Sequence, residues 1–566
     1  MIKLVGLITL LLLVLEAKAK DYSELELKKM IAHMLVLGFD AKSIDKRSDT
    51  YYYIKKYEIG GVILFDRDYH DRKRTKNIES PTQLKKLTSQ LQAISTRPLL
   101  ISVDQEGGKV ARLKSSYGFT KTPSAAKIGS KSDAKTAYTA LAKELNQNGI
   151  NCNFAPVVDL SVNRDNFVIY KLERSYGESA QKVADYAKIF MDSLHDNGIV
   201  SVLKHFPGHG SSLGDSHAGF VDVSDTWSKK ELEPYKKLIK SGSVDMIMTA
   251  HVFNKNLDEK YPATLSYNTN TKLLREELGY DGLIISDDMQ MKAISKQFSL
   301  KDTVTLAINS SVDILLFGNQ LAYQDTGELI EVIYKQVKSG AIPLSRIIES
   351  NRRIDLLHVN SLKPLKIIDR PIDFTPKRIE MSKAYIKEHY GLHVKNIEID
   401  PKIIVLHWTA IMDLNKSYHR LKGDTLYTDR KDIANASLLN VSAHFLVDRD
   451  GTIYRLMKEN SMARHVIGLN YSSIGIENIG GEGNVKEDLT PAQLEANIAL
   501  VRYLKRKFPK IEYLIGHHEY RDMESTSLWL EKDSGYRTEK ADPGDKFMRD
   551  VRKEVRDLKL RTAPVN

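Results

Sequence analysis

The sequence contains a single cysteine, Cys152, among its 566 residues. One cysteine cannot form a disulfide within the chain and cannot supply a cysteine-based zinc cluster, so both kinds of scaffold are excluded. Cys152 lies in an apolar run, which predicts a position in the core. A long exported chain without disulfides is compatible with a bacterial periplasm.

Long hydrophobic runs are also scarce. The run near the N-terminus, Val5–Leu15, is too short for a comfortable membrane span, and no later run reaches that length. It follows Lys3 and precedes Ala17-Lys18-Ala19, a small-x-small pattern typical of signal cleavage sites. We therefore expect residues 1–19 to be a signal peptide, and the mature protein to be periplasmic or secreted with no stable membrane span. An uncleaved anchor is the alternative.

No block of lysine and arginine with interleaved aromatic residues is present, although the formal net charge is +11. The basic balance favours an anionic partner, and the missing block argues against nucleic acid. An anionic cell-wall polymer or membrane surface fits the charge. At roughly 150 residues per domain, the length predicts two to four domains.

From about residue 25 to 360, short apolar runs alternate with amphipathic segments. The runs are β-branched or leucine-rich on both faces, as buried parallel strands are. Their alternation with helical segments over this length predicts an α/β fold, a (β/α)8 TIM-like barrel. The predicted strands are GGVILF (60–65), PLLISVD (98–104), NCNFAPVVDL (151–160), IVSVLKHF (199–206), VDMIMTAHV (244–252), GLIISDD (282–288) and VDILLFGN (312–319).

Polar residues stand at the ends of these runs, where a barrel places its chemistry. They are Asp104, Asp159, Lys204, His205, His251, Asp287 and Asn319.

A glycine-rich stretch, KHFPGHGSSLGDSHAGF, follows one of these strands at 204–220. Pro207 and Gly208 stop any helix between His205 and His209, which argues against a metal-binding pair on one helical face. No Gly-Lys-Ser/Thr follows, so the stretch does not fit a phosphate-binding loop. Asp215 next to His217 can instead fix the imidazole tautomer, which makes a general acid and base. His209 has no predicted role beyond the loop.

Four motifs, DQEGGKVAR, KHFPGHG, DSH and SDDM, together resemble glycoside hydrolase family 3, in particular its β-N-acetylglucosaminidases of the NagZ type. The resemblance implies that Asp287 is the nucleophile of a retaining glycosidase and that His217, oriented by Asp215, is the acid and base. It implies no cofactor for this domain. The residues that it implies for binding N-acetylglucosamine are Asp104, Arg112, Arg174, Lys204 and His205.

The second half has a different order of predicted strands and helices. Prolines in the stretch 361–384 predict a linker after a barrel domain at 20–360. Beyond it, a domain at 385–566 combines strands with one long helix near 489–508. The predicted strands are KIIVLHWTA (402–410), the hairpin SAHFLVDRDGTIYRL (442–456), SIGIENIG (473–480) and YLIGHHEY (513–520).

Three potential metal ligands, His407, His517 and Asp542, stand at strand or loop ends in this half. Two imidazole nitrogens and one carboxylate, with a water, are the ligands of a catalytic zinc site. Glu477, on another strand, could deprotonate the zinc-bound water. Histidines at strand ends are more often structural, so spacing alone leaves both interpretations open.

The order IVLHWTA, SAHF, SIGIENIG, IGHHEY and KADPG resembles the zinc-dependent N-acetylmuramoyl-L-alanine amidases of the AmpD/AmiD type, whose amidase-2 fold has a mixed central sheet. The resemblance implies Zn²⁺ on His407, His517 and Asp542, Glu477 as acid and base, and Lys540 as the group that stabilises the oxyanion. His517 is preferred to His518 because it follows Gly516 directly. His444 is expected to be structural and His465 to line the groove.

One departure from this pattern is an extra segment at 521–537, which we interpret as a flap over the substrate.

The two resemblances predict a bifunctional hydrolase of peptidoglycan fragments, that is, muropeptides, with or without 1,6-anhydro ends. One alternative is a glycosidase with a non-catalytic wall-binding module. Another makes the barrel a broad β-glucosidase or a phosphorylase.

Overall fold

The computed structural model describes residues 22–214, 219–357 and 365–564. Contacts divide the chain into two compact units, Met1–Pro364 and Leu365–Asn566. The predicted signal peptide, the pair Asp215 and His217, and the start of the predicted linker lie outside the described residues. Within the described ranges, no helix combines the length and apolar character that crossing a membrane requires.

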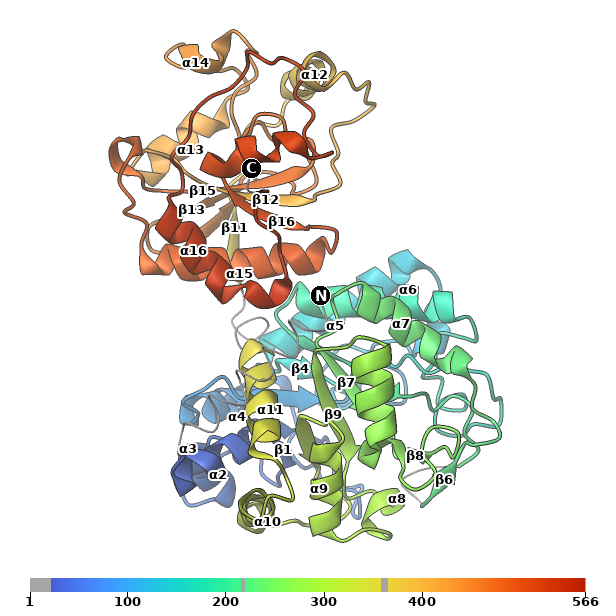
Figure 1. The fold of residues 1–566 in the computed structure, drawn as a ribbon. Helices are drawn as coiled ribbons and strands as arrows, with labels where there is room; N and C mark the ends of the chain where they lie inside the picture. The colour runs from blue at the N-terminus through green and yellow to red at the C-terminus, as the bar shows by residue number, and fades with distance from the viewer. Residues whose placement is uncertain (1–21, 215–218, 358–364, 565–566) are drawn as a thin grey trace. The chain divides into compact units, whose positions relative to one another are not determined.

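The first unit is a closed barrel of eight parallel strands, which confirms the predicted (β/α)8 architecture (Figure 1). Around the barrel the strand order is β1-β10-β9-β7-β5-β4-β3-β2. The strands are β1 Leu35–Gly38, β2 Gly61–Ile63, β3 Leu100–Val103, β4 Cys152–Asn153, β5 Val200–Phe206, β7 Met246–Thr249, β9 Leu283–Asp288 and β10 Ile314–Phe317.

Helices connect these strands, and their local sequences account for where they start. In α6, Ala180–His195, the hydroxyl of Ser179 caps the first turn by accepting the Lys182 amide, and Val183, Ala187 and Phe190 face the core. The other helices of eight or more residues are α2 Glu24–His33, α3 Asp49–Tyr57, α4 Pro81–Ile94, α5 Lys131–Gln147, α7 Glu233–Lys240, the π-helix η5 Asn268–Glu277, α9 Leu300–Asn309, α10 Thr326–Lys338 and α11 Leu344–Leu357.

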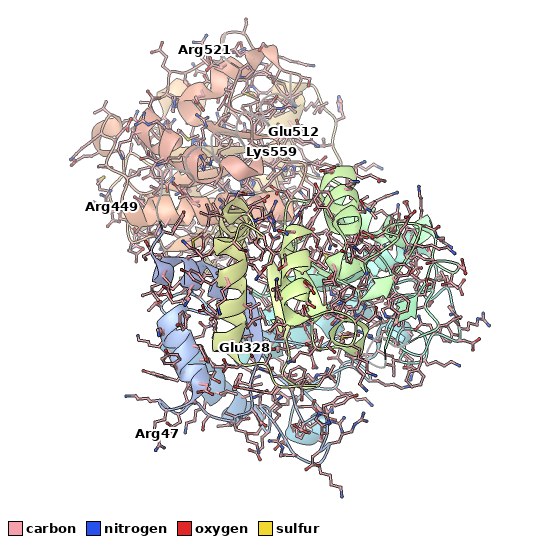
Figure 2. The ribbon with its side chains drawn as sticks, turned by 60° about the horizontal axis from the view of Figure 1, so that its bottom comes forward. Arg47, Glu328, Arg449, Glu512, Arg521 and Lys559 are labelled. Atoms are coloured by element: carbon pink, nitrogen blue, oxygen red, sulfur yellow. The ribbon has the colours of Figure 1, made fainter. Side chains whose placement is uncertain are left out.

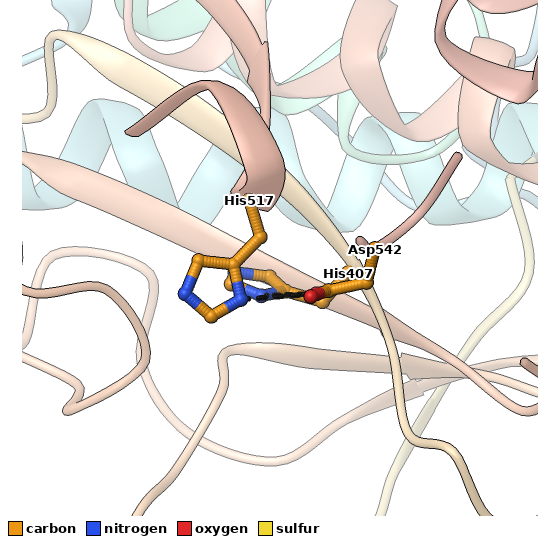
Figure 3. A group of neighbouring side chains, drawn as sticks. All are labelled: His407, His517 and Asp542. Carbon is orange, nitrogen blue, oxygen red and sulfur yellow. Dashed lines mark hydrogen bonds and ion pairs between the residues drawn. The ribbon is translucent and has the colours of Figure 1, made fainter. Parts of the chain in front are cut away.

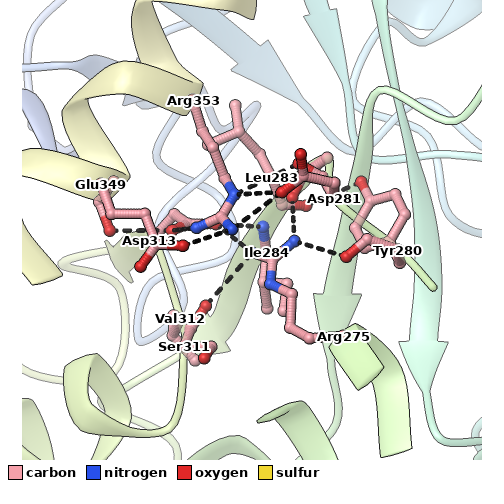
Figure 4. Close-up of polar contacts among 12 residues, drawn as sticks. Arg275, Tyr280, Asp281, Leu283, Ile284, Ser311, Val312, Asp313, Glu349 and Arg353 are labelled. Atoms are coloured by element: carbon pink, nitrogen blue, oxygen red, sulfur yellow. Dashed lines mark hydrogen bonds and ion pairs between the residues drawn. The ribbon is translucent and has the colours of Figure 1, made fainter. Parts of the chain in front are cut away.

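A cluster of arginines around Asp313 holds α11 against the amino-terminal ends of β9 and β10 (Figure 4). Asp313, which is fully buried, accepts hydrogen bonds from Arg275 at 2.5 Å and Arg353 at 3.3 Å. It also accepts the Ile284 amide of β9 at 3.0 Å. Because active sites of barrels lie at the opposite, carboxyl ends, this ionic cluster has a structural role.

The second unit is built on a six-stranded mixed sheet in the order β11-β14-β13-β15-β12-β16, which confirms the predicted mixed α/β fold. Only β13 and β14 pair antiparallel among these neighbours. The strands are β11 Ile367–Asp369, β12 Ile403–Trp408, β13 Phe445–Val447, β14 Ile453–Arg455, β15 Ser473–Asn478 and β16 Tyr513–Gly516. The helical elements include α12 Pro376–Tyr385, α13 Leu414–Lys422, α14 Lys431–Ala434, α15 Pro491–Lys507, the 3-10 helix η9 His517–Ser525 and α16 Asp545–Glu554.

Strand β12 divides its side chains between two cores, because alternate residues of a strand face opposite sides. Ile404 and Leu406 pack with α15 and α16 on one face of the sheet. Ile403 and Val405 pack in the core of the other face. His407 continues this second set, so the alternation directs it away from α15.

The predicted linker is largely part of the second unit. Strand β11 pairs parallel with β14, and α12 begins at Pro376, which the first turn of a helix tolerates because it needs no amide there. Pro371 therefore follows an edge strand and Pro376 starts a helix, and the prediction of a linker over 365–384 is wrong.

Charged side chains of both signs cover the surface of both units, among them the labelled Arg47, Glu328, Glu512 and Arg521 (Figure 2).

Candidate active sites

The barrel has a pocket of about 400 Å³ at the carboxyl ends of its strands. Asp287, the second-last residue of strand β9, lines this pocket. The structure also brings to it all the residues predicted to bind sugar: Asp104, Arg112, Arg174, Lys204 and His205.

An ionic network crosses the floor of this pocket. The Lys204 ammonium, on a side chain that is 2% exposed, lies 2.8 Å from an Asp104 oxygen and 2.7 Å from a Glu106 oxygen. Arg174 donates two hydrogen bonds to Glu106, at 2.8 and 2.7 Å. Burial alone would raise the pKa of Glu106, but Arg174 and Lys204 outweigh it and lower that pKa to about 2. The network therefore keeps its carboxylates ionised and its cations fixed.

Glu106 is a site residue that the sequence analysis missed. It stands two residues after Asp104 in the quoted motif DQEGG, and that proximity was the available signal. Its pairing with Arg174 and Lys204 joins positions 68 and 98 residues apart along the chain, which no local pattern reveals.

His205 is held from both ring nitrogens. Its Nδ1 lies 2.7 Å from a carboxylate oxygen of Asp159, and its Nε2 lies 3.2 Å from a guanidinium nitrogen of Arg174. Because the guanidinium can only donate, Nε2 is the acceptor and Nδ1 carries the proton. Asp159 also accepts the amide of His209 at 2.8 Å, so His209 belongs to the anchor of the glycine-rich loop.

Asp287 is half-buried, and its carboxylate accepts the amide of Asp288 at 2.8 Å. The residues predicted to work with it, His217 and Asp215, lie outside the described part of the chain. Their approach to Asp287 stays a prediction.

The second unit has a larger pocket, of about 850 Å³. It is lined by Glu477, His517, Lys540 and Asp542, with His465. His407, which is 1% exposed, lies directly behind them.

His407, His517 and Asp542 form a compact group at the base of this pocket (Figure 3). The Nδ1 atoms of the two histidines lie 3.2 and 3.0 Å from the same carboxylate oxygen of Asp542. Their potential ligand atoms all lie within 4.8 Å of one another. Two imidazole nitrogens and a carboxylate suit a divalent transition metal, so this group could hold a metal ion.

Burial sets the charge state of this group. It lowers the pKa of His517 to about 4, against the opposing charge of Asp542. Burial would also raise the pKa of Asp542, but His517 and His407 hold that pKa far below its usual range. His517 is therefore neutral near pH 7 beside an ionised Asp542, the protonation states that metal binding requires of these two ligands.

The neighbouring His518 points elsewhere. Its Nδ1 faces the backbone carbonyl of Asp542 at 3.0 Å, and its Nε2 lies 3.1 Å from Asp545. Of the two adjacent histidines, His517 is therefore the one that joins the group.

Glu477 lies beside His407, because the register of β15 on β12 places these two residues opposite each other. Its Oε2 is buried and has no hydrogen-bond partner among the described residues. Burial raises the pKa of Glu477 to about 7, and the negative charge of Asp542 acts in the same direction. Lys540 lines the same pocket and draws that pKa down. A carboxyl group with a pKa near neutrality can exchange protons in both directions.

His444 is fully buried, and both of its ring nitrogens form hydrogen bonds to backbone groups. It donates from Nε2 to the Ser461 carbonyl at 2.8 Å and accepts the Gly475 amide at Nδ1 at 3.0 Å. Two backbone partners leave no ring nitrogen for a ligand, in line with a structural role.

The extra segment, residues 521–537, packs on the core of the second unit. Trp529 stacks on Tyr520 with ring centroids 6.0 Å apart, and Tyr536 accepts a hydrogen bond from Arg464 at 3.0 Å. Glu531 is buried against His389 at 3.0 Å. Tyr536 also lines the pocket, so the segment forms part of its wall.

Two family models match this chain. The Glycosyl hydrolase family 3 N terminal domain model matches residues 24–357, more than half of the chain. The chain belongs to glycoside hydrolase family 3. A second model, N-acetylmuramoyl-L-alanine amidase, matches residues 398–545 of this family 3 chain. The predicted pairing of the two domains is thereby confirmed, and with it the enzyme class at the level of family.

Similar proteins resemble the first unit. Beta-hexosaminidase A of Pseudoalteromonas piscicida is 37% identical over 287 residues, which are 46% of this chain and 46% of that protein. Beta-hexosaminidase of Tolumonas auensis is 36% identical over 275 residues, 47% of this chain and 77% of that protein. The crystal structure of a beta-N-acetylhexosaminidase from Beutenbergia cavernae matches 60% of this chain and 99% of its own, with a TM-score of 0.53 and 25% identity. The chain thus spans about half the length of the first of these relatives.

Proposed function

We propose that this family 3 chain is a bifunctional hydrolase of peptidoglycan fragments. The barrel unit removes a non-reducing β-N-acetylglucosamine, and the second unit cleaves the amide between N-acetylmuramic acid and L-alanine. The names of the relatives of the barrel and the amidase model on the second unit support this pairing. The two reactions cut adjacent bonds of one muropeptide.

In the barrel, Asp287 attacks the anomeric carbon while the glycosidic oxygen leaves. Its carboxylate forms an ester with the sugar, and His217, oriented by Asp215, gives its proton to the leaving oxygen. His217 then takes a proton from a water, which attacks the anomeric carbon from the face that the glycosidic oxygen left and displaces Asp287, so the configuration is retained. The role of Asp287 is supported by its place in the pocket beside Lys204 and Asp104.

The ionic floor of the barrel pocket positions the sugar. Lys204, Arg174 and Arg112 present donors, and Asp104 presents an acceptor, so neighbouring hydroxyl and acetamido groups can be bound in one orientation. These groups are held by one another before substrate arrives, which lowers the entropic cost of binding.

In the second unit, His407, His517 and Asp542 would hold Zn²⁺. A bound zinc ion supplies Lewis acidity, which polarises a carbonyl and makes a water more acidic. Glu477 accepts the proton of the attacking water and passes it to the amide nitrogen of L-alanine as the C–N bond breaks. Lys540 stabilises the negative charge that develops on the carbonyl oxygen.

The observation that carries the amidase proposal is the unpartnered Oε2 of Glu477 beside the three-residue group. A buried carboxylate oxygen without a partner is costly, which is justified where it receives a proton during a reaction. A module that only bound the cell wall would have no need of it.

The test is mass spectrometry of the products from a defined 1,6-anhydro-muropeptide. The intact chain should release free N-acetylglucosamine and free stem peptide. Asp287→Ala should release only the peptide, and His407→Ala only the sugar. Release of the sugar as its 1-phosphate in phosphate buffer would show a phosphorylase, and no peptide release by the intact, zinc-loaded chain would show a binding module.

We also propose that residues 1–19 direct the chain to the periplasm or the outside of the cell. The residues that support this proposal are the apolar run and the Ala17-Lys18-Ala19 pattern. N-terminal sequencing of the mature protein tests it, with cleavage after Ala19 as the expected result.

A further inference from the structure

His465 is a buried histidine of the second unit that the proposed reaction does not use. It lies beside His407, with ring centroids 5.1 Å apart and ring planes nearly perpendicular, at 84°. It is 9% exposed and lines the pocket of this unit. The sequence analysis placed it in the groove wall, and its hydrogen bonds point to a second role.

A chain of hydrogen bonds runs from His407 through His465 into the protein. The Nε2 of His407 lies 3.0 Å from the Nδ1 of His465. The Nε2 of His465 lies 3.1 Å from the hydroxyl oxygen of Ser473. That hydroxyl can donate onward to the carbonyl of Leu469, at 2.8 Å. This series of hydrogen bonds therefore ends at a backbone carbonyl, which can only accept.

A metal bound to His407 would determine which atom donates in each hydrogen bond of this series. The Nδ1 of His407 faces Asp542, so it is the nitrogen that a metal would take, and a ligating nitrogen carries no proton. In the neutral ring the proton then sits on Nε2, which needs an acceptor. The Nδ1 of His465 provides it, His465 donates from Nε2 to Ser473, and Ser473 donates to Leu469. Every buried N–H and O–H in this arrangement has a partner.

The backbone of β15 is shaped for this contact. A side chain at Gly475 would place its Cβ 2.6 Å from the Cγ and Nδ1 atoms of His465. That distance is shorter than such contacts allow, so only glycine lets the ring reach His407. The same Gly475 donates its amide to His444, which fixes the strand at this point.

We propose that His465 is a positioning residue that fixes the metal-binding tautomer of His407, with Ser473 as its own support. This inference rests on the proposed metal site. It adds that the affinity of the site depends on a residue that is not itself a metal ligand, as it does for partners of metal-binding histidines elsewhere.

Zinc affinity of the purified full-length chain tests the inference, measured by competition with a chromophoric chelator. His465→Phe keeps a ring but removes the acceptor, and should weaken zinc binding by about 10- to 100-fold. His465→Asn offers an amide oxygen near the position of Nδ1 and should restore most of the affinity. If His465 served only to fill space in the core, His465→Phe would keep more zinc affinity than His465→Asn, because phenylalanine fills the space better than asparagine.

Three controls keep the outcome readable. His407→Ala defines the background, His518→Asn changes a neighbouring histidine outside the group and should bind zinc as the unaltered chain does, and glycosidase activity reports that the first unit is intact. If His465→Phe does not fold, Ser473→Ala replaces it and should weaken zinc binding by a smaller factor.

Wild-type affinity in folded His465→Phe, or in Ser473→Ala where the first variant does not fold, would overturn the inference and leave the metal site standing. Absence of zinc binding by the unaltered chain would remove the proposed metal site and this inference with it.

Discussion

The two pockets differ in whether their buried charged groups have partners of opposite sign. In the barrel, Lys204 and Arg174 lie against Asp104 and Glu106, so each buried charge already has a partner of opposite sign. In the second unit, Asp542 lies against His517, whose burial favours its neutral form, and Glu477 keeps a buried oxygen without a partner among the described residues.

This difference indicates which pocket is complete by itself. A closed ionic network needs no further ion to be stable, because every desolvated charge is compensated. A carboxylate beside a neutral imidazole gains no opposite charge from it, and a metal cation would supply one. Four experiments test this difference between the pockets, in order of decreasing expected effect.

Separation of the two activities should give the largest effect. Asp287→Ala removes the proposed nucleophile, and we expect kcat/KM for 4-nitrophenyl N-acetylglucosaminide to fall by about 10⁴-fold or more. Release of L-alanine-linked peptide should not change, because Asp287 belongs to the barrel unit. An equal loss of both activities, with the fold intact, would contradict two independent sites.

Removal of Lys204 should destabilise the barrel. Lys204→Met leaves Asp104 and Glu106 short of a buried cation, and breaking such a network costs about 3–5 kcal/mol. The free energy of unfolding of the first unit, from denaturant titration, measures the effect. Lys131→Met is the matched control: Lys131 also lies 2.8 Å from its carboxylate, Asp185, but the pair is on the surface and its loss should leave the midpoint unchanged.

Metal removal should affect the second unit alone. If zinc at about 100 times its dissociation constant binds only the folded state, a chelator should lower the melting temperature of this unit by roughly 5–10 °C. The barrel transition and glycosidase activity should stay where they were. A shift of both calorimetric transitions would mean that a metal also supports the barrel.

A change of pH should give the smallest effect, through His389. Burial alone would lower the pKa of His389, but hydrogen bonds from the ring to Glu531 and to the Ala436 carbonyl outweigh it and raise that pKa. The folded state therefore binds this proton more tightly than the unfolded chain, whose histidine titrates near 6.5. The stabilisation is complete below about pH 6.5 and is lost as pH rises through the raised value.

We expect the second unit to lose about 1 kcal/mol across this range, the net contribution of one typical hydrogen bond. Melting temperature against pH measures it, and His389→Gln should flatten that part of the curve. An unchanged slope in this variant would show that other groups dominate.

Sequence patterns predicted the elements that depend on local composition. Buried apolar runs marked the later strands of the barrel, and the runs KIIVLHWTA and SIGIENIG placed His407 and Glu477 on strands. Strand β1 was missed, because its four residues follow α2 after a single residue, Met34, and read as the end of that helix. Strand β11 was missed because the prolines around it are typical of linkers.

The parts of the sites that could not be predicted depend on contacts between distant segments. His517 and Asp542 belong together by motif, and the structure brings them together. The partners of His407, by contrast, include His465 from another loop. A hydrogen bond between two such rings does not change the pattern of apolar residues, so the sequence does not predict it. The same holds for Glu106, whose two cations come from separate barrel segments.

The ionic cluster around Asp313 has a consequence for synthesis of the protein. Asp313 stands at the start of β10, the last barrel strand, yet Arg346 and Arg353 lie in the following helix α11. A nascent chain that has just released β10 from the ribosome can offer this buried carboxylate only Arg275 of the three. The barrel therefore completes its charge balance only once α11 has emerged, and a fragment of the first unit should extend through Leu357 to fold by itself.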